Sequence, residues 1–240
     1  MRKVLSIAFL GVVGALSCLA GPIVTSTATL DSLIDADGGS LTVGDKTFTN
    51  FSLTSSCSNC TPDSANFINI STLNDGGLLG LRISGPFAAM GPGAFGDWVI
   101  SFDIQVNPAA GMGITNVGLL FNGAVVAPAP GSFADVVETV RDSGGNVLGQ
   151  IAVTNPPAVL QTSLDLSQPF TTLHITKDIQ LGVGGKASSD ARSTISVIDQ
   201  FYTQNPLQSD EPVPEPISLV LMGSGLALLR FLPRRKRSEV

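Results

Sequence analysis

The sequence predicts an all-β protein, an antiparallel β-sandwich of jelly-roll type built from about ten strands. Short apolar stretches rich in Val, Ile and Phe recur along the chain, and Gly- and Asn-rich turns separate them. Only one short stretch has the spacing of an amphipathic helix, and there is no internal repeat. One apolar helix is expected at each end of the chain, outside the sandwich.

The clearest strand covers residues 100–106, where apolar residues alternate with Ser, Asp and Gln. A period of two with one polar face is what a half-buried antiparallel strand requires. Similar patterns predict further strands at residues 41–43, 46–48, 51–53, 67–72, 78–84, 117–121, 136–140, 147–153, 173–183 and 194–201.

Glycine, asparagine and proline mark the connections between these strands. Gly44-Asp45 predicts a two-residue hairpin loop with Gly first, and residues 142–146 predict a second hairpin. Residues 74–77 predict another turn. Residues 85–96 are rich in Gly and Pro, which predicts a long loop before the clearest strand.

Residues 29–34 predict the one short helix of the domain, with Thr29 as its cap. Thr25, Thr27 and Thr29 form a single Thr-x-Thr-x-Thr stretch at its start. An ice-binding surface needs a flat, ranked array of threonines, and one copy is not an array. A polar edge strand is therefore expected here.

The N-terminal end has the three parts of a secretory signal peptide. Arg2-Lys3 supply the charge, residues 4–16 are apolar, and a small-x-small cleavage site ends at Ala20, before Gly21. The alternative is a lipoprotein in which Cys18 carries the lipid. That lipobox is poor, because Ala15 stands where Leu or Val is usual. Residues 1–20 are therefore predicted to be a signal peptide.

The C-terminal end predicts a membrane segment. Residues 206–216 form a linker of Pro and acidic residues that ends in Pro214-Glu215-Pro216. Residues 217–233 follow as a predicted transmembrane helix, and residues 234–240 as a basic tail that stays cytoplasmic. At about 1.5 Å per residue the apolar run spans roughly 24 Å, short of a bilayer core of about 30 Å. The stop-transfer cations are Arg230, Arg234, Arg235, Lys236 and Arg237.

Charge restricts the partners of the domain predicted for residues 21–205. Residues 21–229 hold 6 Lys and Arg against 18 Asp and Glu, a net charge of −12. All the other Lys and Arg residues lie in the two ends of the chain that are predicted to face the membrane. An acidic exterior argues against nucleic acid or anionic lipid as a partner of the domain.

Cys57 and Cys60 are the cysteines that remain after cleavage at Ala20. Outside the cytoplasm, two cysteines at this spacing favour a disulfide that closes a small loop; free thiols and a redox pair are the alternatives. A zinc site needs about four ligands, whereas the chain has one histidine and no second cysteine pair. No metal or cofactor is therefore predicted.

Three other groups of residues are candidates for chemistry, and no catalytic residue is predicted among them. His174 is expected to be an exposed strand histidine. Glu138 shares a strand face with apolar residues, so a buried carboxylate there would need Arg82 or Arg141 as partner. Glycosidase chemistry would need a second carboxylate about 5–10 Å away. An EF-hand loop from Asp35 fails at its fifth and twelfth positions, which leaves only an irregular calcium site at Asp31, Asp35 or Asp37.

The tripartite tail resembles the PEP-CTERM sorting signal of Gram-negative bacteria, with Pro214, Glu215 and Pro216 as the tripeptide. The same tail is known as the ice-binding protein C-terminal domain. The resemblance implies export through the Sec translocon and recognition by an exosortase, a membrane-embedded cysteine transpeptidase-like enzyme. It further implies removal of the tail and delivery to the cell surface or the exopolysaccharide matrix. Residues 38–55 are similar to a block in uncharacterised exported proteins with this tail.

The leading functional hypothesis is a non-enzymatic, exported protein with a structural or glycan-binding role. Before processing, its domain would lie in the periplasm with the tail in the inner membrane. One alternative is a secreted carbohydrate-active enzyme tethered by the same signal; another is a membrane-anchored periplasmic protein whose tail is never removed. Two acidic residues that converge in a cleft would favour the enzyme.

Overall fold

The computed structural model describes residues 23–35 and 39–207. The predicted signal peptide, the Pro-Glu-Pro tail with its basic cluster, and both terminal helices lie outside these residues, as does Asp37. Within the described ranges, no helix is both long enough and apolar enough to span a membrane.

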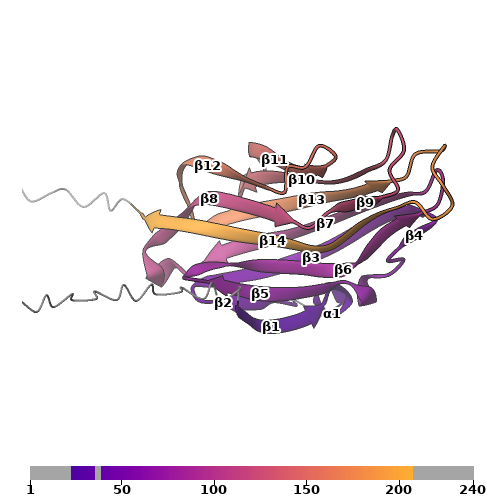
Figure 1. Ribbon diagram of the computed structural model, residues 1–240. Coiled ribbons are helices and arrows are strands. Elements are labelled where there is room, and N and C mark those ends of the chain that lie inside the picture. Colours follow the sequence, from indigo (N-terminus) through magenta and orange to yellow (C-terminus); the bar gives the residue numbers. More distant parts are fainter. Residues whose placement is uncertain (1–22, 36–38, 208–240) are drawn as a thin grey trace, which may run out of the picture. The chain divides into compact units, whose positions relative to one another are not determined.

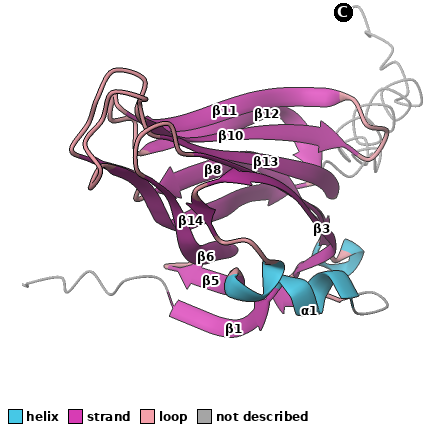
Figure 2. Ribbon diagram, turned by 90° about the vertical axis from the view of Figure 1, so that its right-hand side faces the viewer, coloured by secondary structure: helices cyan, strands magenta, loops and turns pink. Residues whose placement is uncertain are grey.

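The described chain is an antiparallel sandwich of two sheets, which confirms the predicted all-β class (Figures 1 and 2). It has 14 strands rather than about ten, and one α-helix. The strands are β1 (Ile23–Thr29), β2 (Leu41–Val43), β3 (Lys46–Ser58), β4 (Cys60–Thr61), β5 (Asn69–Asp75), β6 (Leu78–Met90), β7 (Phe95–Val106), β8 (Met112–Phe121), β9 (Ala124–Val126), β10 (Phe133–Asp142), β11 (Val147–Asn155), β12 (Gln161–Phe170), β13 (Thr172–Gly182) and β14 (Arg192–Pro206). The helices are α1 (Leu30–Asp35) and the short 3-10 turns η1 (Ala65–Phe67) and η2 (Pro108–Ala110).

The first sheet has the order β1-β5-β6-β14-β8-β12, with β4 paired to β6 and β9 to β14. The second sheet has the order β11-β10-β13-β7-β3-β2. From β6 onward the long strands cross between the sheets at every connection except the β10–β11 hairpin. The resulting orders, β6-β14-β8-β12 and β7-β13-β10-β11, are those of a jelly roll, in which two Greek keys are interleaved.

The core lies between the two sheets and is built from the inward face of each strand. In β7 the predicted alternation is confirmed, because Ile100, Phe102, Ile104 and Val106 are all 0% exposed. Aromatic rings join the two layers of this core. The Phe48 ring of β3 packs on the Tyr202 ring of β14, in the opposite sheet, with ring centroids 5.9 Å apart.

The predicted helix is confirmed as α1, which lies at one edge of the sandwich (Figure 2). The Thr29 hydroxyl oxygen accepts a hydrogen bond of 3.3 Å from the Ser32 backbone N–H, as its role as cap requires. Leu30 and Leu33 are buried, but Ile34 is exposed. β1 is an edge strand of the first sheet, as expected for the threonine stretch.

Both predicted hairpins are also confirmed. Val43 pairs with Lys46 across the β2–β3 turn, where Gly44 has φ +59°, a conformation that favours glycine. β10 and β11 pair across residues 143–146.

The loop predicted for residues 85–96 is wrong: β6 continues to Met90 and β7 begins at Phe95. Phe87 of β6 still pairs with β14, beyond a register shift that accommodates the Gly and Pro. Gly96 is needed inside β7, because a Cβ there would lie 2.2 Å from the Trp98 ring. These residues therefore mark an irregular pairing and a close contact rather than the end of a strand.

Candidate ligand-binding site

A pocket of about 350 Å³ lies beside the short strand β4. Its walls come from β4, from the loop between β4 and η1, from η1 itself and from β6. The lining residues are Thr61, Pro62, Asp63, Phe67 and Pro86. The volume is at the lower end of what small-molecule sites use.

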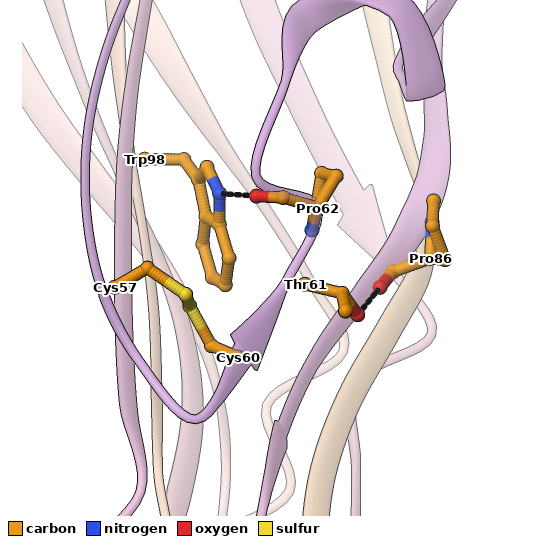
Figure 3. Close-up of a disulfide and its surroundings, with 6 residues drawn as sticks. All are labelled: Cys57, Cys60, Thr61, Pro62, Pro86 and Trp98. Atoms are coloured by element: carbon orange, nitrogen blue, oxygen red, sulfur yellow. Dashed lines mark hydrogen bonds between the residues drawn. A yellow bond between two sulfur atoms is a disulfide. The ribbon is translucent and has the colours of Figure 1, made fainter.

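Three contacts fix the wall of this pocket to the rest of the domain (Figure 3). Cys57, near the end of β3, is disulfide-bonded to Cys60 at the start of β4. The Thr61 hydroxyl donates a 2.7 Å hydrogen bond to the Pro86 carbonyl of β6. The Trp98 ring N–H donates a 2.8 Å hydrogen bond to the Pro62 carbonyl. The loop is thus attached to both sheets.

Trp98 makes this attachment rigid because the side chain is itself part of the core. It is 0% exposed, and its ring meets Phe87 edge-on at 5.3 Å. A buried indole needs a partner for its N–H. The Pro62 carbonyl supplies that partner, so the position of the pocket wall is linked to the packing of the core.

Phe67 is the one aromatic side chain of the pocket, and it is 57% exposed. The pattern of residues 67–72 predicts a strand that starts at Phe67, but Phe67 ends η1, and the strand begins at Asn69. The Ser64 hydroxyl caps this turn by accepting a 3.3 Å hydrogen bond from Asn66 N–H. The adjacent Ile68 is 0% exposed and occupies the core, which leaves the Phe67 ring at the surface.

The chemistry of the pocket is that of an apolar platform with polar groups beside it. The Phe67 ring and the two prolines offer carbon surface to the apolar face of a ligand. Asp63 adds a carboxylate, which accepts hydrogen bonds, and the Thr61 oxygen keeps acceptor capacity beyond the bond it donates. A ring-shaped ligand with one apolar face and hydroxyl groups at its edge would satisfy both parts.

His174 lies on the outer face of β13, opposite the buried Leu173 and Ile175, as expected. Its Nδ1 is 2.7 Å from the Asp103 carboxylate of β7, and both side chains are partly exposed. A shallow pocket of about 280 Å³ includes these two residues and Asp142. The pair is a surface contact between neighbouring strands.

Glu138 is buried, but the predicted partners are wrong. It is 0% exposed on the inner face of β10, and its carboxylate accepts hydrogen bonds from Lys177 and Gln200. The predicted partners are bonded elsewhere, Arg82 to Asp199 and Arg141 to Thr176. Lys177 is directly opposite Glu138 on the neighbouring strand, which makes it the closer cation. A carboxylate enclosed in this way cannot reach a substrate in a cleft.

One pair of carboxyl groups does meet at the surface of the second sheet. Asp97 of β7 and Asp178 of β13 are neighbours on this sheet, and one carboxyl oxygen of each is buried without a hydrogen-bond partner among the described residues. Partial burial raises the pKa of Asp97, and the neighbouring Asp178 raises it further. Across the described residues, no three His, Cys, Asp or Glu side chains cluster as metal ligands.

The fold and the site define a two-sheet β-sandwich with a surface pocket, and comparisons with known proteins add little to this. No family model and no curated protein matches the chain. One similar solved structure is the enzymatically active domain of tailspike protein 4 from bacteriophage CBA120, with 12% identity and a TM-score of 0.29. It is matched over 64% of this chain and 19% of its own. Another is a carbohydrate-binding module of the β-sandwich superfamily, with 13% identity and a TM-score of 0.23. It is matched over 66% of this chain and 58% of its own. Similarity at this level carries no argument about function.

Proposed function

We propose that this chain is an exported, non-enzymatic glycan-binding protein, sorted to the cell surface or exopolysaccharide matrix by its C-terminal signal. The observation that carries the binding function is Phe67, an aromatic ring 57% exposed in a pocket whose wall is fixed to both sheets. A pre-formed platform of this kind binds without the cost of ordering a loop.

The composition of the pocket favours a glycan over other small ligands. Sugar rings present C–H groups on one face and hydroxyl groups around the edge, which matches the Phe67 ring beside Asp63 and Thr61. The net charge of −12 over residues 21–229 favours neutral or cationic polysaccharides over anionic ones. Glu138 is enclosed in the core and therefore cannot act as a glycosidase carboxylate on a bound glycan.

Replacing Phe67 with alanine is expected to weaken glycan binding about 30-fold, since truncation of a central aromatic contact costs about 2 kcal/mol. A glycan array identifies the oligosaccharide, and titration of that oligosaccharide gives Kd for each variant. Phe95→Ala is the matched control, because this ring is also exposed but packs on Phe133 outside the pocket. Equal Kd values for Phe67→Ala and the unchanged protein would refute the assignment of the pocket.

Sorting by the tail rests on Pro214-Glu215-Pro216, the apolar segment and the basic cluster. In cells that contain an exosortase, we expect the mature protein to end upstream of Val240. Mass spectrometry of the C-terminal peptide from the surface fraction measures this directly. A surface protein that still ends at Val240 would refute sorting, and would favour a membrane anchor that is never removed.

A further inference from the structure

Three polar side chains meet in the apolar space between the two sheets. Glu138 comes from β10 and Lys177 from β13, both of the second sheet, whereas Gln200 comes from β14 of the first. Their exposed fractions are 0%, 1% and 1%. Polar groups buried to this degree are expensive unless each has a partner. The cluster therefore needs an explanation that the glycan pocket does not provide.

The carboxylate of Glu138 bridges an amine and a carboxamide. Lys177 Nζ donates a hydrogen bond to Glu138 Oε2, and Gln200 Nε2 donates one to Glu138 Oε1. Lys177 and Glu138 are also directly opposite in the β10–β13 register, so the strand pairing fixes their approach. One carboxylate thus contacts both the nitrogen that can attack an amide and the nitrogen that would have to leave.

Two further polar atoms of this region lack a hydrogen-bond partner among the described residues. They are Gln200 Oε1 and the Tyr202 hydroxyl. Tyr202 lies two residues after Gln200, on the same inward face of β14, and is 2% exposed. Burial raises the pKa of the Tyr202 phenol, and the charge of Glu138 raises it further. The phenol therefore stays protonated and able to donate.

Burial also affects the amine. It lowers the pKa of Lys177, while the contact with Glu138 acts in the opposite direction. A lower pKa increases the fraction of neutral amine, the form that acts as a nucleophile. The apolar surroundings exclude water, which would compete as a nucleophile.

We propose that Lys177 and Gln200 become joined by an intramolecular isopeptide bond, with Glu138 as the catalytic proton carrier. Lys177 Nζ attacks the Gln200 side-chain carbonyl carbon, and negative charge develops on Oε1. Glu138 accepts the proton from Nζ and delivers it to Nε2, after which the carbon–Nε2 bond breaks and ammonia leaves. Amine and primary amide become a secondary amide and ammonia, so atoms balance and no oxidant is needed. The product covalently links β13 of one sheet to β14 of the other.

A second lysine cluster in the same sandwich serves as an internal contrast. Lys46 donates hydrogen bonds to Asp45 and to the Gln204 side-chain oxygen, and Gln204 Nε2 donates to Asp45 at 2.8 Å. In this second cluster the Lys46 amine contacts both the Asp45 carboxylate and the Gln204 amide oxygen, whereas Lys177 contacts the Glu138 carboxylate. Asp45 is also 21% exposed. A charged ammonium suits that geometry, so we expect Lys46 to remain unmodified.

Mass spectrometry of the full chain, isolated from the exported fraction, tests the proposal. The peptide that contains Lys177 should be linked to the peptide that contains Gln200, with the joint mass one ammonia lower. Trypsin should not cleave after Lys177, because an acylated lysine is not a substrate, whereas it should cleave after Lys46. Glu138→Ala and Gln200→Leu should each abolish the linked peptide, and Lys46→Arg should leave it unchanged.

The unchanged protein alone can overturn this proposal, whether or not the variants fold. Separate peptides with unmodified Lys177 and Gln200 in the folded, exported protein would refute the bond. Loss of one water, with Lys177 linked to Glu138, would refute the role of Gln200 as acyl donor. A linked peptide that persists in Glu138→Ala would refute Glu138 as the proton carrier. None of these outcomes depends on glycan binding. Failure of the isopeptide proposal can therefore be distinguished from failure of the glycan-pocket assignment.

Discussion

Glu138→Ala is expected to destabilise the folded domain by about 3–5 kcal/mol, the usual cost of leaving a buried charge without its partner, and loss of the proposed cross-link adds to this. Lys177 is 1% exposed and would lose the carboxylate that it contacts. Gln200 would lose the acceptor of its amide hydrogen bond at the same time. Urea unfolding measures the change, with fluorescence of the single tryptophan as the signal, because Trp98 is fully buried.

Two comparisons isolate the cause of that loss. The double variant Glu138→Leu/Lys177→Met should be more stable than Glu138→Ala, since apolar replacement of a buried pair is often neutral. Neither variant can form the isopeptide bond, so their difference reflects the unpaired amine together with the better filling of the Glu138 site by leucine. Asp103→Ala removes the partner of His174 at the surface and should cost less than about 1 kcal/mol. A double variant no more stable than Glu138→Ala would contradict this account.

Replacing Pro214, Glu215 and Pro216 together with alanine is expected to abolish removal of the tail. Two prolines restrict φ and favour an extended backbone, and a glutamate supplies charge, so the triple variant changes both properties of the predicted motif. The protein should then accumulate in the membrane fraction with Val240 intact. Fractionation and mass spectrometry of the C-terminal peptide measure both effects.

The matched control for the tripeptide is Glu211→Ala/Pro212→Ala, which changes one acid and one proline of the same linker outside the motif. This control should be processed normally. If the triple variant reaches the surface with the same C-terminus as the unchanged protein, the tripeptide is not the recognised element. Glycan binding should be equal in both variants, because the pocket is over 100 residues away in sequence and fixed within the sandwich.

Sequence patterns predict the fold well where burial alternates residue by residue. Residues 100–106 form one strand because one face of β7 lies in the core and the other in solvent. The helix was predictable because Thr29 caps it, and Leu30 and Leu33 share one face. β12 was not predicted, since its inward residues are only half buried and the contrast between its faces is weak.

The site residues were harder to predict because their neighbours are distant in sequence. Lys177 follows Glu138 by 39 residues, and only the β10–β13 register places them opposite each other. The sequence offers Arg82 and Arg141 as cations but does not contain the strand register that excludes them. The β propensity of Phe67 predicts a strand, whereas the Ser64 cap starts a 3-10 turn there instead. That capping serine was the available signal.

The position of β14 determines when the domain can fold during synthesis and export. It is the last strand along the described part of the chain, yet it lies in the middle of its sheet, between β6 and β8. When the chain emerges with its N-terminus first, the edges of β6 and β8 that pair with β14 stay unpaired until residues 192–206 have emerged. Open strand edges are the sites at which β proteins associate wrongly. The time between emergence of β8 and of β14 is thus the interval in which the chain depends most on being kept apart from other chains.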